Sequence, residues 1–406
     1  MTTETATMPL APRMSRFKPS PSQVATARAR ELRAEGRSIV SLTAGEPDFP
    51  TPRHVKQAVL DAMEVNNTKY TPINGTIPLR QAASAKFARD NGLNYSPDQI
   101  TVGSGTKQIL FNCLMASVGQ GDEVICPAPY WTSYPDIVKI AGGTPVDVVC
   151  GQNQNFKMRP EQLEEAINPQ TKWLVLCSPN NPSGATYTKD ELLAFADILR
   201  AHPQVWVLTD DVYEHLIFDG REFFTIAQVA PHMYERTITC NGVSKAYSMT
   251  GWRVGFAGGP LPMIQAMSKM QSQSTAGVSA ISQAAATAAL NGPQQLVIDR
   301  TANLQYRRDI LMDYLNAAEG LSCDKPEGAM YIFCSCAGVI GKRTPNGKLI
   351  ENDRDFTRYL LEDVGVAVVQ GEAYGLSPYV RVSFVAAEDD LHKGGKLIQE
   401  ACAALQ

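Results

Sequence analysis

Lys245 lies in a segment whose residue types suit covalent attachment of a carbonyl compound. The segment runs from Asn241 to Gly255 and reads NGVSKAYSMTGWRVG. Small residues around the lysine let its amine approach a carbonyl carbon closely, as a Schiff-base enzyme requires. Arg253 follows in the same Gly-rich stretch, and a guanidinium there can bind a phosphate dianion through two parallel hydrogen bonds. An exposed lysine and a surface arginine are the alternative interpretation of this segment.

Two further segments could bind a flat, phosphorylated ligand. The turn from Gly103 to Lys107 joins an expected strand to an expected helix, so Gly105 and Thr106 would present free N–H groups to a phosphate. Its spacing is neither a Walker loop nor a GxGxxG fingerprint, and a plain tight turn is the alternative. Trp131 comes just after another expected strand and could stack on a heteroaromatic ring, or simply pack in its loop.

Three polar residues near other strand ends extend the candidate site. Asp210 directly follows the expected strand Val205–Thr209, and a carboxylate there can keep a pyridine nitrogen protonated, which makes the ring an electron sink. Tyr213 could bond an oxygen substituent on such a ring. Asn181, fixed ahead of a proline, can donate to a phenolate or carboxylate oxygen. The alternatives are a helix-capping aspartate, for which Asp211 is an equal candidate, and a turn closed by the asparagine.

Arg381 interrupts an otherwise apolar strand that ends near Phe384. A buried guanidinium is costly without an anionic partner, and no acidic residue lies near it in the sequence. A substrate carboxylate is a good candidate for that partner, because arginine binds carboxylates through paired hydrogen bonds. If the strand were at the edge of a sheet, Arg381 could instead face water.

Length and composition limit the classes of protein to consider. With 406 residues, 44% of them hydrophobic, the chain is expected to form one large and one smaller domain. A net charge of −4 gives no electrostatic reason to expect a nucleic acid or an anionic membrane as partner. No apolar run approaches the roughly 18 residues of a spanning helix. The N-terminus resembles no secretory signal, and nine scattered cysteines fit a reducing cytoplasm without a metal site.

Short β-branched runs alternate with helical stretches from about residue 51 onward. This alternation predicts a mostly parallel, doubly wound α/β sheet, in which ligands bind at the carboxyl ends of the strands. We expect a large domain over 51–293 and a small domain made of 1–50 and 294–406. The strands expected in the large domain are Ile100–Val102, Glu123–Cys126, Pro145–Val149, Trp173–Cys177, Val205–Thr209, Thr237–Cys240 and Val254–Ala257. Those expected in the small domain are Met330–Cys334, Val366–Val369 and Val380–Phe384, and the long helices include Gln23–Glu35 and Gln294–Ala318.

Taken together and in this order, the segments resemble the class I aminotransferases, which are pyridoxal-phosphate enzymes of fold type I. The resemblance runs from about Arg13 through Phe384 and is closest to the bacterial aspartate aminotransferase branch called Iβ, which includes prephenate-using members. Its most specific parts are AGEPDFPTP from Ala44, the Lys69-Tyr70 pair, SPNNPSG from Ser178 and the Lys245 segment. It implies a seven-stranded, mostly parallel sheet flanked by helices and a smaller α+β domain.

The resemblance also assigns roles around the cofactor, pyridoxal 5′-phosphate. Lys245 would hold it covalently and later carry the proton between two carbons, and Asp210 would pair with the ring nitrogen. Tyr213 and Asn181 would bond the ring oxygen, and Trp131 would stack on the ring. The phosphate would be bound by Gly105, Thr106, Arg253 and, from the neighbouring subunit of a homodimer, Tyr70.

The substrate's α-carboxylate would be held by Arg381, Asn181 and the backbone of Gly45. Two departures from the enteric and animal enzymes concern this chain: Gly242 replaces a phosphate-binding serine, and no arginine occurs between Arg253 and Arg300 for a distal carboxylate. In the Iβ branch that carboxylate is recognised by other residues, which match Lys18, Ser20, Ser22 and Lys107. Lys18 is also where prephenate recognition would fall.

The resemblance therefore implies an aminotransferase that moves the α-amino group between aspartate or glutamate and 2-oxoglutarate or oxaloacetate, with prephenate or aromatic substrates as further candidates. The alternatives within the same fold are a C–S β-lyase or an alanine or aromatic aminotransferase. A second class of hypothesis is a binding or regulatory protein that keeps this fold without catalysing a reaction. No segment of the chain looks like an added DNA-binding or partner-binding module, which counts against it. A nucleotide-binding oxidoreductase that used the turn at Gly103 fails on motif spacing.

Overall fold

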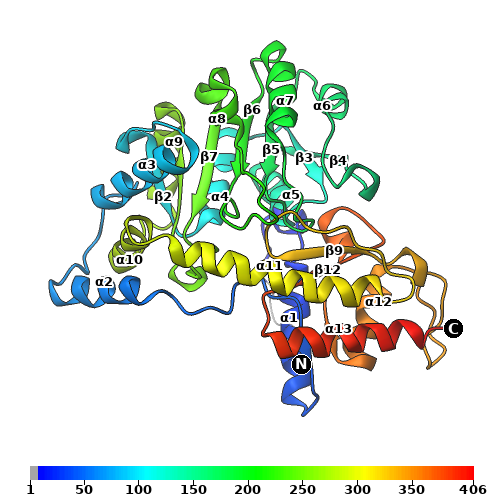
Figure 1. Ribbon diagram of the computed structural model, residues 1–406. Coiled ribbons are helices and arrows are strands. Elements are labelled where there is room, and N and C mark those ends of the chain that lie inside the picture. The colour runs from blue at the N-terminus through cyan, green and yellow to red at the C-terminus, as the bar shows by residue number, and fades with distance from the viewer. Residues whose placement is uncertain (1–7) are drawn as a thin grey trace, which may run out of the picture.

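Seven strands form the central sheet of the larger part of the molecule (Figure 1). The computed structural model describes residues 8–406, without the side chain of Ser22. Six strands run in the same direction and β8 alone is antiparallel to both of its neighbours, so the expected mostly parallel sheet is confirmed. In sheet order the strands are β2 (Ile100–Gly103), β8 (Gly255–Gly258), β7 (Thr237–Gly242), β6 (Trp206–Asp210), β5 (Thr171–Cys177), β3 (Glu123–Ala128) and β4 (Thr144–Val149).

Helices cover both faces of this sheet because its strands are apolar on both sides. In β5, Trp173 and Val175 pack into one core with α4, α5 and α9, whereas Leu174 and Leu176 pack into another with α6 and α7. Successive side chains of a strand point to opposite faces, so one run of sequence serves both cores. The helices of this part are α2 (Arg53–Glu64), α3 (Ile77–Asn91), α4 (Thr106–Ser117), α5 (Ser133–Ala141), α6 (Pro160–Ala166), α7 (Lys189–Ala201), α8 (Ile226–Val229), α9 (Leu261–Ser272) and α10 (Ala280–Asn291).

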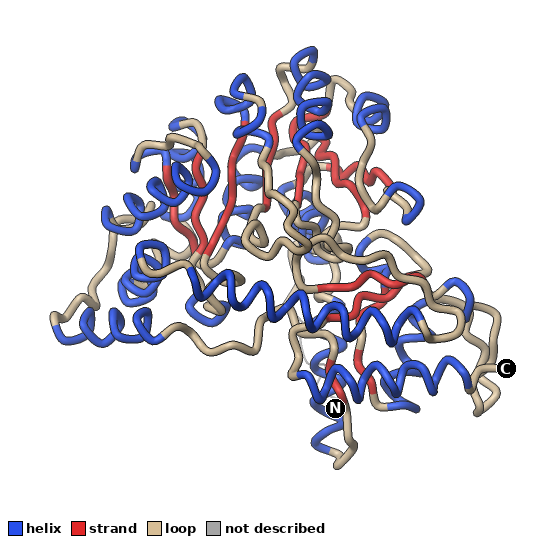
Figure 2. The backbone as a smooth tube through the Cα atoms, in the orientation of Figure 1, coloured by secondary structure: helices blue, strands red, loops and turns tan. Residues whose placement is uncertain are grey.

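The smaller part joins the N-terminal segment to the C-terminal third of the chain (Figure 2). An antiparallel sheet has the order β11-β12-β9, and β1 pairs with β10 in parallel. In the view of Figure 1 the long helix α11 runs below the central sheet and above α13, against which it packs. The elements are α1 (Pro21–Ala34), β1 (Val40–Ser41), α11 (Gln295–Asn316), β9 (Tyr331–Ser335), α12 (Asp353–Tyr359), β10 (Val366–Ala367), β11 (Val369–Gln370), β12 (Tyr379–Ser383) and α13 (Glu388–Ala403).

Two details differ from the expectations. The single strand expected at Val366–Val369 is two short strands, because the chain leaves β1 at Ala367 and joins β12 at Val369. Asp210 is the last residue of β6 and not the first beyond it. The division into a large domain over 51–293 and a small domain over 1–50 and 294–406 stays a prediction. Residues 1–7 of the expected small domain lie outside the described part. Among residues 8–406, no helix combines the length and apolar character needed to cross a bilayer.

Candidate active site

A cavity of about 870 Å³ opens between the carboxyl ends of the central strands and the smaller part of the molecule. This is the edge at which a doubly wound sheet is expected to bind ligands. Its lining comes from segments far apart in the chain, from Ser20 to Arg381. The residues expected at the site that line it are Gly45, Thr106, Lys107, Trp131, Asn181, Asp210, Tyr213, Lys245, Arg253 and Arg381.

Lys245 lies in the connection between β7 and β8, with its amine in the cavity. Its Nζ donates to the carbonyl oxygen of Gly45 at 2.5 Å and lies 5.6 Å from the centre of the Tyr213 ring. A glycine on each side of this connection lets two backbones approach: a Cβ on Gly255 would lie 2.3 Å from the backbone nitrogen of Thr106. The amine is thus held at one point, but only by a carbonyl that a ligand can replace.

Asp210 presents one free carboxylate oxygen in this cavity. Its Oδ2 accepts a hydrogen bond from the Tyr134 hydroxyl at 2.7 Å, whereas its Oδ1 is buried without a hydrogen-bond partner. Burial raises the pKa of Asp210, and the Tyr134 hydroxyl and the Lys245 charge oppose that rise. A buried, unpaired carboxylate oxygen is costly, so the site is suited to a cationic N–H from a ligand.

Tyr213 places its hydroxyl next to that of Tyr331. The two oxygens are 3.0 Å apart and share a hydrogen bond, and the rings meet edge to face. Burial, and then the neighbouring Tyr331, raise the pKa of Tyr213 well above its ordinary value. The hydroxyl therefore stays protonated near neutral pH and can donate to an oxygen of a bound ring.

Arg381 is buried in β12, the central strand of its three-stranded sheet, with 3% of its surface exposed. The alternative in which it faces water from a sheet edge is therefore wrong. Its Nη1 donates to Asn181 Oδ1 at 3.2 Å and its Nη2 to the carbonyl oxygen of Thr43 at 2.8 Å. The Tyr331 ring lies 4.2 Å from the guanidinium carbon. Its Nε has no partner, and no carboxylate neutralises its charge among the described ion pairs.

The turn before α4 and the side chain of Arg253 face each other at the other end of the cavity. A Cβ on Gly105, whose φ is +83°, would lie 2.4 Å from Arg253 Nη2, so only glycine fits there. Arg253 itself has φ +55°, a backbone conformation that costs a non-glycine residue about 1 kcal/mol or more. Its guanidinium donates to the carbonyl oxygens of Ser104 and Thr250, which aims it at the N-terminus of α4. A helix N-terminus beside a guanidinium is suited to a phosphate.

Lys107 and Trp131 lie together at a further wall. The Lys107 amine is 4.7 Å from the indole ring centre, and Trp131 meets Tyr134 edge to face at 5.4 Å. Burial, and then the charge of Arg253, lower the pKa of Lys107. The indole offers a flat surface, and the lysine a second cationic group near it.

Of the remaining expected residues, Ser20 lines this cavity and Lys18 and Tyr70 do not. Lys18 is exposed to solvent. The side chain of Ser22 is outside the described part. Tyr70 is 98% exposed and borders a different cavity of about 430 Å³, together with residues near Gly277. The assigned roles of Lys18 and Tyr70 therefore stay predictions.

Several residues that build the site carried no recognisable signal in the sequence. Tyr134 holds Asp210, Tyr331 contacts both Tyr213 and Arg381, and Thr43 holds Arg381 only through its backbone. Their contacts bridge elements that meet only in the folded chain. Arg30 and Arg33 of α1 also line the cavity and were not expected there.

The chain belongs to the class I and II aminotransferases, because the family described as "Aminotransferase class I and II" matches residues 37–394. It is therefore a pyridoxal-phosphate-dependent transaminase of fold type I. The aspartate/prephenate aminotransferase of Cereibacter sphaeroides is 51% identical over 392 residues, covering 97% of this chain and 98% of that protein. The aspartate aminotransferase of Rhizobium meliloti (strain 1021) is 53% identical over 379 residues, covering 93% and 92%.

Solved structures agree with these sequence relatives. The crystal structure of the Rhizobium meliloti aspartate aminotransferase has a TM-score of 0.96 and 51% identity, and it covers 98% of this chain and 100% of that one. The Thermus thermophilus aspartate aminotransferase with maleate has a TM-score of 0.89 and 39% identity, covering 97% and 100%. The fold and its type are confirmed along nearly the whole chain.

The side chains in the cavity fit pyridoxal phosphate. The unpaired Oδ1 of Asp210 can accept from a protonated ring nitrogen, and the turn at Gly105 with Arg253 can receive the phosphate. Trp131 offers a stacking surface and Lys245 an amine. The carboxylate oxygen, the phosphate site and the amine border one cavity. A single ligand with a protonated ring nitrogen, a phosphate and a carbonyl carbon could therefore contact all three.

Proposed function

We propose that this transaminase moves the α-amino group between aspartate or glutamate and 2-oxoglutarate or oxaloacetate, in two half-reactions at one site. The observation that carries the substrate class is Arg381, a buried guanidinium that lines the cavity without a carboxylate partner. A buried arginine in this state is stabilised by a carboxylate that binds through two hydrogen bonds. Relatives named aspartate aminotransferase support the same assignment.

The charges that line the cavity favour a substrate with two carboxylates. The cationic side chains are Arg30, Arg33, Lys107, Lys245, Arg253 and Arg381, and the anionic ones are Glu46 and Asp210. A bound phosphate dianion balances only part of this excess. A dicarboxylic amino acid balances more of it than a neutral one does. The Thermus thermophilus relative was solved with maleate, itself a dicarboxylate.

Each residue has a separate task in this proposal. The cofactor, when bound, supplies an electron sink for the pair left behind when the α C–H bond breaks. Lys245 takes the proton from the α-carbon and returns it elsewhere, and Asp210 keeps the ring nitrogen cationic. Arg381 holds the α-carboxylate and so fixes the direction in which the α C–H bond points. Tyr213 and Asn181 donate to the ring oxygen.

Lys107 and Ser20 are our candidates for the distal carboxylate, since both line the same cavity as Arg381. Lysine side chains are flexible and specify a ligand's shape less strictly than an arginine fork does. A second candidate substrate is therefore prephenate, with Lys18 as a recognition residue. The name of the Cereibacter sphaeroides relative, an aspartate/prephenate aminotransferase, favours this candidate.

We also propose a homodimer in the cytoplasm, with Tyr70 reaching the phosphate of the neighbouring subunit's site. Tyr70 is almost fully exposed and lies away from the cavity of its own chain, which supports a role in the other subunit. Mixing Lys245→Ala subunits with Tyr70→Ala subunits tests this arrangement. Each mixed dimer would contain one intact site, so activity should return on mixing. No recovery in verified mixed dimers would place Tyr70 outside the partner's site.

Absorbance spectra of the holoenzyme test the activity. The band of the bound cofactor between about 330 and 430 nm should change on adding aspartate or glutamate, and arogenate, the amino acid formed from prephenate, should do so if prephenate is a substrate. The 2-oxo acid should reverse the change. Lys245→Ala should abolish turnover, and borohydride should trap the cofactor on the peptide containing Lys245. Release of pyruvate and ammonia without a 2-oxo acid acceptor would instead support a β-lyase.

A further inference from the structure

The segment from Asp210 to Leu216 has two differently used faces. Asp210 and Tyr213 point into the active-site cavity. Glu214 and His215 instead border a second cavity, of about 360 Å³, together with Asp90 at the end of α3. The residues that hold Glu214 and His215 in place therefore also set the position of Asp210 and Tyr213, which contact the cofactor in the proposed site.

Glu214 is fixed on this second face by two residues of α3. Only 3% of its side chain is exposed, and its Oε1 lies against the amine of Lys86, whose side chain is 1% exposed. Its Oε2 accepts a hydrogen bond from Asn91 Nδ2 at 2.8 Å, and Lys86 in turn donates to Asn91 Oδ1 at 2.7 Å. The three side chains form a closed, buried ring of contacts.

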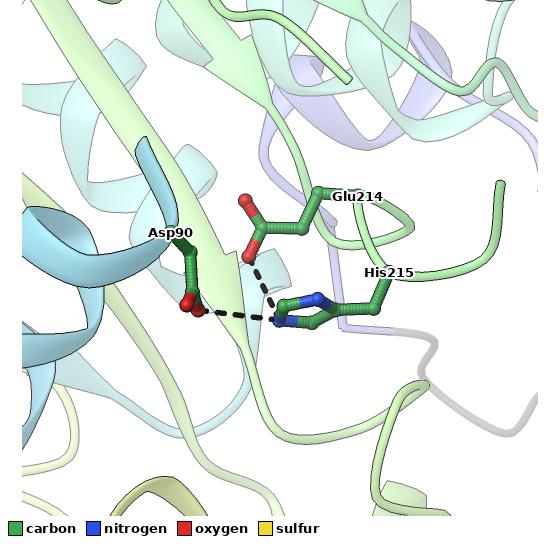
Figure 3. Close-up of side chains that lie close together, drawn as sticks. All are labelled: Asp90, Glu214 and His215. Atoms are coloured by element: carbon green, nitrogen blue, oxygen red, sulfur yellow. Dashed lines mark ion pairs between the residues drawn. The ribbon is translucent and has the colours of Figure 1, made fainter. Parts of the chain in front are cut away.

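His215 and Asp90 extend the cluster toward the surface (Figure 3). The His215 Nε2 lies 3.1 Å from Glu214 Oε1 and 3.6 Å from Asp90 Oδ2. These three groups could be taken as ligands of a metal ion. However, the ammonium of Lys86 already lies against the oxygen that such an ion would need, so the cluster has its cation within the chain.

The charges in this cluster depend on Lys86. Burial is the largest influence on Glu214 and disfavours its carboxylate, but Lys86, His215 and Asn91 together outweigh burial and hold the pKa of Glu214 below its usual value. Asp211 is buried close by, and burial together with the charge of Glu214 raises its pKa well above the ordinary value. Without Lys86, three buried carboxyl groups, those of Asp210, Asp211 and Glu214, would lie in one short segment, and Glu214 would lose its buried cationic partner.

Few backbone contacts hold the middle of this segment. Asp211 N donates to Cys240 O at 2.9 Å, and Leu216 O accepts from Ala329 N at 2.9 Å. Between them, the bonds from Glu214 N to Asp211 O and from Leu216 N to Tyr213 O close turns within the segment itself. Another hydrogen bond to this stretch of backbone comes from Thr301 Oγ1 of α11, which donates to His215 O at 2.9 Å. The side chain of Glu214 is thus a direct tie between the middle of the segment and a rigid helix.

We propose that Lys86 and Asn91 are positioning residues, which act through Glu214 to hold Asp210 and Tyr213 in the geometry that the cofactor requires. The inference rests on the proposed function of those two side chains. A shift of about 1 Å in groups that contact reacting atoms can slow an enzyme about 100-fold. The buried ion pair resists such a shift because separating its charges would leave each of them unpaired.

Lys86→Met in the holoenzyme tests this inference. We expect kcat to fall about 10- to 100-fold with KM for aspartate changed less than about threefold. The pH titration of the cofactor's absorbance should also move, because that titration depends on the placement of Asp210 and Tyr213. Lys86→Met/Glu214→Gln, which removes both charges, should recover part of the loss. Asn91→Ala should produce a smaller change in the same direction, and it serves if Lys86→Met does not fold.

Arg80→Met is the matched control. Arg80 is a buried cation of the same helix, but it binds the carbonyl oxygens of Gly75 and Pro97 and does not contact the segment. The Arg80→Met substitution should lower the melting temperature of the protein and leave both kcat and the pH titration of the cofactor's absorbance unchanged. If Lys86→Met and Asn91→Ala behave like this control, the inference is overturned while the proposed function stands. If the absorbance of the wild-type holoenzyme titrates with pH but the enzyme does not transaminate aspartate, the proposed substrate is wrong. The absorbance titrations of the variants would then still show whether Lys86 and Asn91 position Asp210 and Tyr213.

Discussion

The hydroxyl of Tyr134 donates to Asp210 Oδ2 at 2.7 Å, in the interior of the protein. Tyr134 lies in the first turn of α5 and Asp210 ends β6, so the contact joins two elements that border the active-site cavity. Burial, and then the charge of Asp210, raise the pKa of Tyr134 well above its usual range. The tyrosine therefore remains a donor, and the carboxylate that it stabilises keeps its other oxygen unpaired, as the proposed contact with the ring nitrogen requires.

Tyr134→Phe should shift the acid limb of the activity profile to higher pH. The hydrogen bond from Tyr134 lowers the pKa of Asp210 against the effect of burial, so its loss raises that pKa further. Asp210 acts as a carboxylate, so activity is lost as the pH falls through its pKa, and the variant should lose activity sooner. A hydrogen bond to a charged group contributes about 1.5–3 kcal/mol, so kcat should fall about 10-fold or more. An unchanged acid limb in kcat against pH would contradict this.

Gly105→Ala should weaken cofactor binding. The new methyl group would lie 2.4 Å from Arg253 Nη2, and the residue would keep a φ of +83° that alanine adopts only at a cost of about 1–3 kcal/mol. We expect the dissociation constant for pyridoxal phosphate to increase at least about 10-fold, as measured by titrating the cofactor-free protein. Gly92→Ala is the control, since Gly92 also has positive φ but has nothing within 4 Å of its added methyl. Equal loss of affinity in both variants would refute a specific contact.

Arg381→Lys should reduce kcat/KM for aspartate about 100-fold, which corresponds to about 3 kcal/mol. A lysine keeps the charge but loses the paired geometry and the stacking on Tyr331. Arg308→Lys is a matched control, because Arg308 is a buried arginine that binds both oxygens of Asp219 outside the cavity. That control should lower the melting temperature while kcat/KM stays near the wild-type value. A loss confined to Arg308→Lys would contradict the role of Arg381.

Sequence reasoning could locate the strands of the central sheet because each is a short apolar run between polar turns. It could also place Asp210 and Lys245 at one edge of the sheet, since parallel strands end on the same side. It could not divide Val366–Val369 between two sheets, because all four residues are apolar and their partners, Ser41 and Arg381 among them, lie far away in the chain.

The supporting contacts of the site were beyond the reach of sequence patterns for a similar reason. Tyr134, Thr43 and Glu214 act through partners that only the folded chain brings near, and buried tyrosines and threonines are common elsewhere. Local spacing identifies side chains that contact a ligand when they occur in recognisable turns. It does not identify the residues that hold those side chains, because their positions depend on the packing of whole elements.

Lys107→Met should separate dicarboxylic from neutral substrates. Lys107 lines the cavity beside Trp131, and burial together with the charge of Arg253 lowers its pKa, so it loses its charge at a lower pH than a free lysine does. In the wild-type enzyme, kcat/KM for aspartate should therefore decline as the pH rises through this pKa, whereas the value for alanine should not. Lys107→Met should lower kcat/KM for aspartate about 10-fold and abolish the decline, and Lys107→Arg should keep activity to higher pH.

Lys269→Met is the control, because Lys269 is an exposed lysine on α9, and it should change neither profile. If Lys107→Met affects aspartate and alanine alike, the distal carboxylate is recognised by other residues.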